Sequence, residues 1–287
     1  MLSKQNNTYF RRNKKRIMVY LAIIFIVFTA SKTYIDTNIF RINKVQLDTD
    51  KIPLGTEISI MQISDVHNKV FGNQNEKLIE AVKRNNADII VLTGDLVDRK
   101  TSNYSNVFFL VEKLKEINRN IYFVTGNHEW ENKYTEEILD GLSKRGITIL
   151  NNKNTQITIG TTTINLVGID NQSTNHENIN LAFDGVSREF YTVLLSHSPT
   201  VVEEYQDIQV NLILSGHTHG GQVRVPLIGA LIAPDQGFFP ELDKGIFEIS
   251  SKRYLYIDSG LGTSVVPIRF WNQSQISLVN VVGTNGK

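Results

Sequence analysis

The stretch VNLILSGHTHGGQ, residues 210–222, joins an apolar run to two histidines that are separated by one residue and flanked by glycines. The apolar run predicts a buried strand, and Gly216 allows the backbone to turn where the strand ends. His217 and His219 can then present their imidazole rings to the same small volume. Because neutral imidazole is the commonest metal ligand in proteins, the stretch predicts a metal-binding loop. A polar loop with incidental histidines is the alternative, since the His-x-His pattern is short.

The composition fits one large α/β domain together with a membrane segment. The chain has 287 residues, of which 41% are hydrophobic and 21% are charged. It has no cysteine, which excludes a disulfide framework and a thiolate zinc site. The net charge of +1 hides an asymmetry, because residues 1–35 hold seven basic side chains and no acid, which leaves 23 basic against 29 acidic residues elsewhere. The mildly acidic remainder argues against a nucleic-acid partner, for which a basic face is typical.

An apolar segment near the N-terminus predicts a membrane anchor. Residues 17–30 are apolar without interruption, and residues 31–35 extend the segment to a length that can span a bilayer. The basic cluster before it predicts a cytoplasmic N-terminus and an extracytoplasmic main domain. A cleaved signal peptide is the alternative, although the segment lacks a good A-x-A cleavage pattern. The arginine pair 11–12 is similar to a twin-arginine signal, but lysines stand at 14–15, where an apolar pair is usual.

The chain divides into four predicted parts. Residues 1–16 form a basic cytoplasmic N-terminus, residues 17–35 a transmembrane signal-anchor helix, residues 36–56 a connector, and residues 57–287 the main domain. The connector contains a predicted strand at 41–47, where the apolar side chains alternate with polar ones.

From residue 57 onward, predicted strands alternate with predicted helices, which indicates an α/β fold. Strands are predicted at 58–64, 88–93, 121–125, 163–169, 191–195 and 210–214, and in the tail at 246–249, 254–257 and 275–282. Helices are predicted at 75–86, 102–118 and 135–145.

Five of the predicted strands end in motifs that contain metal-ligand side chains. These are Asp65-x-His67, Gly94-Asp95-x-x-Asp98, Gly126-Asn127-His128-Glu129, His197 and His217-x-His219. Ligands of α/β sheets bind beyond the carboxyl ends of the strands, so all five motifs belong to one edge. Five of the six histidines lie in these motifs, and only His176 lies elsewhere. Taken singly, the acids and Asn127 are common turn or cap residues, so the prediction of a metal site rests on their combination.

The motif set resembles that of the calcineurin-like metallophosphoesterases, in particular the membrane-associated bacterial branch typified by YaeI and YkuE. The resemblance covers about residues 58–282 and includes the later Ser-Gly-Leu-Gly-Thr at 259–263. One departure is Glu129, where many relatives carry Asp, and it lies outside the metal-ligand set. The resemblance implies a four-layer α/β/β/α metallophosphoesterase sandwich over residues 57–287, with a dinuclear metal site at its edge and one N-terminal transmembrane helix.

The resemblance also implies a role for each motif residue. One metal ion would be held by Asp65, His67, Asp95 and His219, and the second by Asp95, Asn127, His197 and His217. His128 would act as general acid toward the leaving oxygen, and Asp98 would orient its imidazole. Carboxylate, imidazole and amide ligands suit divalent ions such as Zn, Mn or Fe. Two such ions neutralise charge on phosphoryl oxygens and lower the pKa of bound water.

The expected function is phosphoester hydrolysis by a membrane-anchored enzyme. The resemblance suggests a phosphodiesterase or pyrophosphatase whose substrates are phosphorylated small molecules or lipids, including lipid-linked molecules similar to UDP-2,3-diacylglucosamine. A broad phosphomonoesterase is the alternative activity. A non-catalytic binding platform is the alternative class, and it would be expected to lack ligands that are all present here. Arg224 and Arg269 are either phosphate contacts or solvated surface residues, and both stay outside the predicted site.

Overall fold

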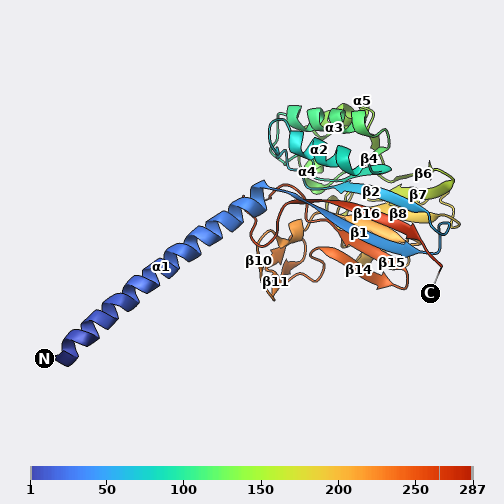
Figure 1. Ribbon diagram of the computed structural model, residues 1–287. Helices are drawn as coiled ribbons and strands as arrows, with labels where there is room; N and C mark the ends of the chain where they lie inside the picture. The colour runs from blue at the N-terminus through green and yellow to red at the C-terminus, as the bar shows by residue number, and fades with distance from the viewer. Residues whose placement is uncertain (1, 265, 286–287) are drawn as a thin grey trace.

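The computed structural model describes residues 2–264 and 266–285 and consists of a long N-terminal helix and an α/β domain (Figure 1). Helix α1 (Leu2–Asn38) has 37 residues and extends away from the domain. Such a helix is about 56 Å long. Its part Asn13–Asn38 is long and apolar enough to cross a membrane, and none of its apolar window is buried. The predicted anchor segment, residues 17–35, lies within this part.

The first sheet contains six strands in the order β1-β16-β2-β3-β4-β5. Strand β1, which follows α1, pairs in parallel with the C-terminal β16, and β16 pairs antiparallel with β2. Strands β2 to β5 run parallel to one another, so the loops that follow β2, β3 and β4 meet at one edge. The strands are β1 (Arg41–Thr49), β2 (Glu57–Ile63), β3 (Ile89–Thr93), β4 (Ile121–Val124), β5 (Thr148–Ile149) and β16 (Gln275–Gly283).

The second sheet also contains six strands, in the order β14-β15-β9-β8-β7-β6. Its four central strands run parallel, and its two edge strands run antiparallel to their neighbours. The strands are β6 (Lys153–Ile159), β7 (Thr162–Gly168), β8 (Tyr191–Leu195), β9 (Leu212–Ser215), β14 (Gly245–Ser250) and β15 (Arg253–Ile257). Two small hairpins lie outside both sheets, formed by β10 (Arg224–Val225) with β11 (Gly229–Ala230) and by β12 (Ile232–Ala233) with β13 (Gly237–Phe238).

Three apolar clusters hold the layers together. The first packs three helices onto the outer face of the first sheet, with Leu110 of α3 and Leu92 of β3 fully buried. The second lies between the sheets and includes Val91 and Leu214. The third covers the outer face of the second sheet, where only short helices pack. The helices are α2 (Glu76–Asn85), α3 (Ser105–Ile117), α4 (Asn127–Trp130), α5 (Thr135–Lys144), α6 (Ile179–Ala182) and α7 (Val201–Glu204).

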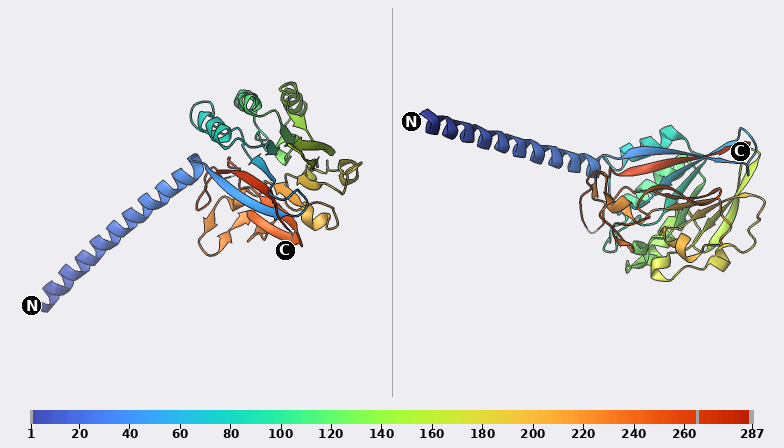
Figure 2. Two further views of the ribbon diagram at one scale, coloured as in Figure 1. Left: turned by 45° about the vertical axis from the view of Figure 1, so that its right-hand side comes forward. Right: turned by 90° about the horizontal axis from the view of Figure 1, so that it is seen from below.

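This arrangement confirms the predicted α/β/β/α architecture, and Figure 2 shows α2, α3 and α5 on one side of it. Within the α/β domain, the predicted strands and helices are present with ends that differ by up to three residues, whereas α1 begins 15 residues before the predicted anchor segment. Strands β5 and β6, the hairpins β10–β13 and the short helices α4, α6 and α7 were not predicted. The predicted strand within residues 36–56 is β1, and it is paired along its whole length as a member of the first sheet.

Candidate metal centre

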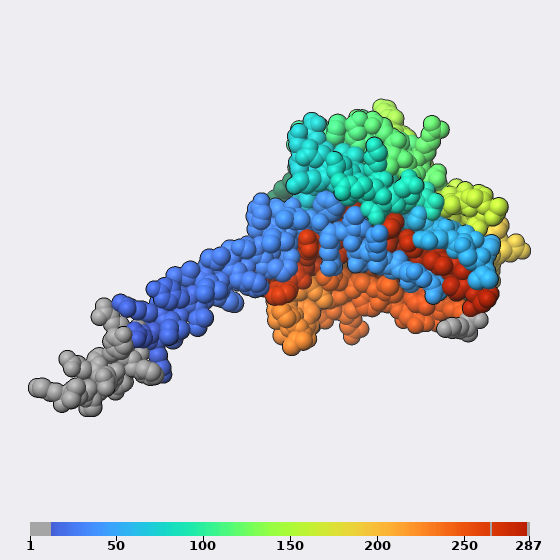
Figure 3. Space-filling model, in the orientation of Figure 1, coloured from blue at the N-terminus to red at the C-terminus, as the bar shows by residue number. Residues whose placement is uncertain are grey.

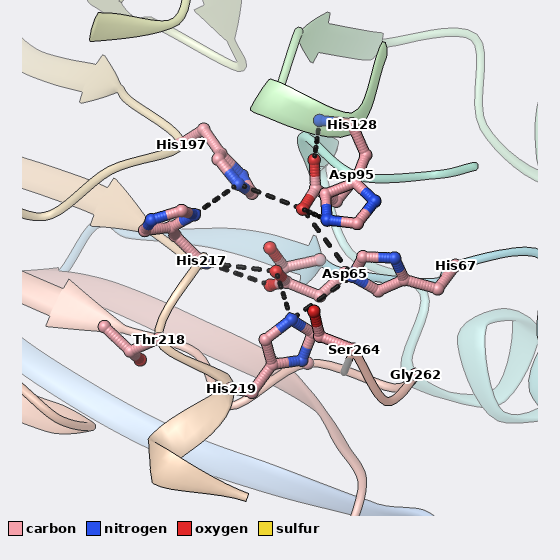
Figure 4. A network of polar contacts seen from close by, with 12 residues as sticks. Asp65, His67, Asp95, His128, His197, His217, Thr218, His219, Gly262 and Ser264 are labelled. Carbon is pink, nitrogen blue, oxygen red and sulfur yellow. Dashed lines mark hydrogen bonds and ion pairs between the residues drawn. The ribbon is translucent and has the colours of Figure 1, made fainter. Parts of the chain in front are cut away.

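The loops that follow β2, β3, β4, β8 and β9 converge at one edge of the two sheets (Figure 4). They carry the predicted residues in pairs: Asp65 and His67 after β2, Asp95 and Asp98 after β3, Asn127 and His128 after β4, and His217 and His219 after β9, with His197 alone after β8. Hydrogen bonds connect the loops across the sheets, since the backbone N–H of His217 donates to Asp65 Oδ1 over 3.1 Å. The sandwich therefore gathers all nine side chains, which are far apart in sequence, in one place.

The first cluster contains Asp65, His67, Asp95 and His219, each with a ligand atom within 4.8 Å of the others. The Nε2 atoms of His67 and His219 are 3.2 Å apart. His67 Nε2 lies 3.5 Å from Asp95 Oδ2, and His219 Nε2 lies 3.6 Å from Asp65 Oδ1. Two imidazole nitrogens that face each other among carboxylate oxygens in a buried site are suited to share a cation.

The second cluster contains Asp95, His197 and His217. His197 Nε2 lies 3.3 Å from Asp95 Oδ2 and 3.1 Å from His217 Nδ1. Asn127 is buried beside them, and its Oδ1 atom has no hydrogen-bond partner among the residues that the structure describes. A buried amide oxygen without a partner is costly unless it binds something, so this atom is suited to complete the ligand set. Asp95 belongs to both clusters.

The outer nitrogens of two histidines are held in place by hydrogen bonds. His197 Nδ1 lies 2.8 Å from the carbonyl oxygen of Thr93, and His217 Nε2 lies 2.7 Å from Asp235 Oδ2. Such contacts fix the ring orientation and leave the inner nitrogen, with its lone pair, pointing into the cluster. The hydrogen bond from His217 lowers the pKa of Asp235, against the effect of burial. The residues of both clusters therefore fit divalent metal ions by donor type and by orientation.

The ionisation states of His67, His219 and Asp95 agree with a metal-binding role. For His197, burial acts to lower the pKa, but the charge and hydrogen bond of Asp95 outweigh it and raise the pKa to about 10, so a metal ion would have to displace its proton. Burial lowers the pKa of His67 and of His219, which favours the neutral imidazole that binds metals. For Asp95, burial acts to raise the pKa, but the charge and hydrogen bond of His197 and the charges of His67 and His128 outweigh it. The pKa of Asp95 consequently lies well below its ordinary value, and the side chain is a carboxylate.

The backbone of the site is strained. Five of the seven predicted metal ligands have positive φ angles: Asp65 (50°), His67 (47°), Asp95 (53°), His217 (69°) and His219 (51°). This left-handed conformation is uncommon outside glycine and costs roughly 1–3 kcal/mol at each residue in a strained site. Such residues concentrate at binding and catalytic sites, so the strain supports a functional interpretation that is independent of the ligand chemistry.

Glu129 ties two of the loops together. Its fully buried carboxylate accepts hydrogen bonds from the backbone N–H groups of Asp95 (2.9 Å), Leu96 (2.7 Å), Val97 (3.3 Å) and Gly126 (2.7 Å). The sequence pattern leaves Glu129 outside the ligand set and assigns it no role. The structure gives it a positioning role, because it joins the loop of Asp95 to the loop of Asn127.

His128 lies at the margin of the clusters, where Asp98 and Arg99 contact its ring. Its Nδ1 atom is 3.1 Å from Asp98 Oδ1, and its Nε2 atom is 3.1 Å from Arg99 Nη2 and 4.0 Å from Asp95 Oδ2. Arg99 also pairs with Glu131 over 3.1 Å. The ring of His128 can therefore exchange a proton beside the first cluster while a carboxylate orients it.

A cavity of about 530 Å³ opens beside the clusters. Its lining includes the polar side chains of Asn127, His128 and His219. It also includes the apolar side chains of Ile232 and Val266. The cavity is large enough for a ligand with both a charged and an apolar part.

The two arginines for which the sequence allows either a phosphate contact or a surface role do not line this cavity. Arg269 is fully buried, and its guanidinium donates to the carbonyl oxygens of Gly262, Ser259 and His219. Arg224 pairs with Asp243 over 2.6 Å. A solvated surface role is therefore wrong for Arg269, which supports the backbone behind His219. His176 lies outside the site and stacks on Trp130 at 3.7 Å between ring centroids.

Comparisons with known proteins agree with the geometry. A family model described as calcineurin-like phosphoesterase matches residues 58–221. The uncharacterized metallophosphoesterase YkoQ of Bacillus subtilis is 29% identical over 266 residues, which cover 91% of this chain and 97% of that protein. The metallophosphoesterase YkuE of the same organism is 26% identical over 258 residues, covering 88% of this chain and 89% of that protein.

Among solved structures, the sulfate thiohydrolase SoxB of Thermus thermophilus superposes with a TM-score of 0.51. The identity is 13%, and the match covers 73% of this chain and 52% of that chain. A likeness at this level of identity concerns the fold alone.

Proposed function

The chain belongs to the calcineurin-like phosphoesterases and is a metal-dependent phosphoester hydrolase, and from this premise we propose that its substrates are phosphodiesters or pyrophosphates. The observation that supports the proposal is the cavity, which is lined by both metal-ligand and apolar side chains. A diester or pyrophosphate has two substituents on its phosphoryl groups, and one of them can occupy the apolar side while the other leaves past His128.

We assign the two metal positions to the two clusters. Asp65, His67, Asp95 and His219 would hold one ion, and Asp95, Asn127, His197 and His217 the other, with Asp95 shared. When bound, two divalent ions supply charge neutralisation at the phosphoryl group and a water of lowered pKa. The ligand types do not select among Zn, Mn and Fe.

His128 is the proposed proton donor to the leaving oxygen. For this role, Nδ1 would carry a proton toward Asp98 Oδ1, 3.1 Å away, in place of accepting from the backbone N–H of Arg99 (3.2 Å), and Nε2 would deliver a proton toward the cavity. The contact with Asp98 fixes the orientation of the ring. Arg99, whose Nη2 lies 3.1 Å from the same Nε2, stands where it can contact a phosphoryl oxygen.

The proposed substrate class is lipid-linked, for example a molecule similar to UDP-2,3-diacylglucosamine. The apolar residues of the cavity lining, Val223, Ile232 and Val266, support an acyl-bearing ligand. The apolar part of α1 supports a location at a membrane.

For topology we propose a cytoplasmic N-terminus and an extracytoplasmic domain, because the basic residues precede the span. The chain lacks cysteine, so single cysteines report on topology directly. In intact cells, a membrane-impermeant thiol reagent should label a Leu54→Cys variant and leave a Lys15→Cys variant unlabelled until the cells are lysed. The reverse pattern would overturn this topology.

The test of the activity is hydrolysis by the full-length protein in detergent, reconstituted with Mn, Zn or Fe. Bis-p-nitrophenyl phosphate should be cleaved faster than p-nitrophenyl phosphate, and Asp95→Asn should abolish both reactions. Because p-nitrophenolate leaves readily without a proton, His128→Ala should lose little on this diester. It should lose roughly 10²–10⁴-fold on a diester with an alkyl leaving group, such as glycerophosphocholine.

Each outcome has a separate meaning. A faster reaction with the monoester would replace the proposal by a phosphomonoesterase. Equal losses of His128→Ala on both diesters would contradict its role as proton donor. If the fully metallated protein turns over none of the substrates, the phosphodiesterase proposal fails, and metal stoichiometry of Asp95→Asn would still test the ligand assignment.

A further inference from the structure

Two segments beside the metal centre expose large apolar side chains on the side from which α1 leaves the domain. We call them together the apolar rim: residues 225–239, which include the hairpins, and residues 266–271. Its exposed members include Leu227, Ile228, Phe238 and Phe239 from the first segment and Trp271 from the second. Leu227 is fully exposed, and Phe238 is 78% exposed. Exposed apolar groups that gather in this way mark interaction surfaces.

The rim is almost free of charge. Residues 225–239 contain one charged side chain, Asp235, and residues 266–271 contain one, Arg269. Asp235 is partly exposed but its carboxylate contacts His217, and Arg269 is fully buried. Loops that face water normally carry charged side chains, so the outer surface of the rim is unlike a solvated loop.

The rim is fixed to the end of α1. The backbone N–H of Arg269 donates to Thr37 Oγ1 over 2.8 Å, and that of Ser274 donates to the carbonyl oxygen of Asp36 over 2.8 Å. Gln222 Nε2 donates to Ile268 O over 3.1 Å and so ties the start of the hairpin region to the second segment. The rim and α1 are therefore parts of one connected structure.

Beyond these contacts at the end of α1, the rim also contacts residues closer to the apolar part of the helix. Trp271 lies 6.3 Å from Phe28 between ring centroids, and Lys32 Nζ lies 5.1 Å from the Trp271 ring. Phe28 precedes Asp36 by two helical turns, which corresponds to about 12 Å along the axis. Tryptophan and lysine at this level are typical of the boundary between lipid and water. Figures 1 and 2 show hairpin β10–β11 on the same side, beside the end of α1.

The rim is also continuous with the cavity. Ile232 and Val266 are exposed members of the rim segments and also line the cavity. In the space-filling view, the orange surface of the hairpin region lies next to the red C-terminal segment where α1 leaves the domain (Figure 3).

We propose that the apolar rim inserts into the interfacial layer of the bilayer that α1 spans, and that it opens the cavity toward the lipid phase. The inference rests on the proposed membrane anchorage. The partner of the rim is a lipid surface, because the rim contacts the part of α1 at which the helix would enter the bilayer. An amphiphilic phosphoester can then reach the metal centre while its acyl chains remain in the bilayer.

The experiment uses the absence of cysteine in the full-length chain. Leu227→Cys and Phe238→Cys place a fluorophore sensitive to polarity on the rim. Leu54→Cys is the matched control, because Leu54 is also an exposed leucine (67%) but lies past the far end of β1, a strand of nine residues that begins beside α1. Phe25→Cys, at a position 69% exposed in α1, reports on the span itself. Each protein is reconstituted into phosphatidylcholine–phosphatidylglycerol nanodiscs with and without a headgroup-proximal nitroxide lipid.

The rim labels should lose fluorescence in the presence of the nitroxide lipid and shift their emission to the blue, whereas the Leu54→Cys label should do neither. If the Phe25→Cys label responds and the rim labels behave like Leu54→Cys, the docking inference is overturned and the anchor stands. If no label responds, the anchor fails and the inference fails with it.

Two controls accompany the labelling. Hydrolysis of bis-p-nitrophenyl phosphate by each labelled protein tests fold and catalysis, since none of the four positions lines the cavity. Oxidative cross-linking of Phe238→Cys to itself in nanodiscs, without quenching by lipid, would identify the rim as a contact between two copies of this chain and would overturn the proposal.

Discussion

At the scale of single residues, Glu129 is the side chain with the largest predicted effect outside the ligand set. Each of its carboxylate oxygens accepts from two backbone N–H groups. In Glu129→Gln one oxygen becomes an amide NH₂ that faces two N–H donors. The buried donors that lose their acceptor should lower the free energy of unfolding by roughly 2–4 kcal/mol. Thermal unfolding followed by tryptophan fluorescence measures this loss.

The control for this substitution is Glu131→Gln, two residues further along the chain. Glu131 is partly exposed and pairs with the exposed side chain of Arg99, so its replacement should change the unfolding midpoint little. Equal midpoints for both variants would contradict the role of Glu129.

Asp258 gives a prediction on pH dependence. Burial raises its pKa to about 6 from 3.8, although hydrogen bonds from Ser277, Gly260 and Gln275 act in the opposite direction. Between these two pH values the folded state binds a proton that the unfolded state has lost, so the free energy of unfolding falls as pH rises, by up to roughly 3 kcal/mol in total. Relative to an Asp258→Asn variant, the wild type should therefore lose thermal stability between pH 4 and 6. If the thermal stability of the two proteins changed with pH in the same way, the raised pKa of Asp258 would be contradicted.

Individual site residues differed in how far the sequence could predict them. Asp95 and His217 were predictable because each closely follows an apolar strand and has a side chain with obvious ligand chemistry. Arg269 and Asp235 were not, because their roles depend on burial and on contacts with loops distant in sequence. In the sequence, Glu129 is noticeable only because many members of the family carry Asp at this position. Its partners are backbone N–H groups, which every residue type except proline has, so no sequence motif indicates them.

At the scale of elements, the turns after the strands decide whether the ligands meet. Gly94 ends β3 with a φ of +88°, and a Cβ there would lie 2.4 Å from His197 Nδ1 and 2.7 Å from Gly126 N. Gly94→Ala should therefore displace the loop of Asp95 and lower the rate of hydrolysis by about 100-fold, as misplacement by 1 Å can. Steady-state hydrolysis of bis-p-nitrophenyl phosphate measures the loss.

Gly160, in the turn between β6 and β7, is the matched control. Its φ is also positive (+59°), but nothing lies within 4 Å of a Cβ at that position. Gly160→Ala should cost about 1 kcal/mol of stability through backbone strain and leave hydrolysis unchanged. A comparable loss of activity in both variants would mean that strain, and not the contact with His197, decides the effect.

The elements that the sequence did not predict are either too short or too polar to show a pattern, and strand β5 and helices α4, α6 and α7 have only two to four residues. Strand β6 is an edge strand with the sequence KNTQITI, in which only two residues are apolar, and it depends on pairing with β7. Hairpins β10–β13 have two residues in each strand, too few for a pattern of period two to show. The buried central strands β3, β8 and β9 have continuous apolar runs and were predicted correctly.

At the scale of the whole molecule, the metal centre joins the two sheets. The proposed ligands Asp65, Asp95 and Asn127 follow strands of the first sheet, and His197 and His217 follow strands of the second. Ions that bind only the folded state stabilise it by about 2.7 kcal/mol at 100 times the dissociation constant. Removal of metal by a chelator should therefore lower the thermal midpoint as well as abolish activity.

The comparison protein for this prediction is Asp95→Asn, which weakens both proposed metal positions. Before the chelator is added, the thermal midpoint of this variant should be lower than that of the wild type, and the chelator should change it little. A chelator that inactivates the wild type without changing its midpoint would show that the ions contribute to the reaction and not to the cohesion of the sheets.

The place of β16 between β1 and β2 has a consequence for biosynthesis. Strand β1 leaves the ribosome soon after α1, but its partner begins at Gln275, more than 220 residues later. At 5–20 residues per second this interval lasts roughly 10–50 s, during which the edge of β1 is unpaired. Nascent chains stalled before β16 should therefore be digested by protease within residues 41–56, whereas released chains should resist. Completion of translation, and not insertion of the anchor, would then be the event that closes the first sheet.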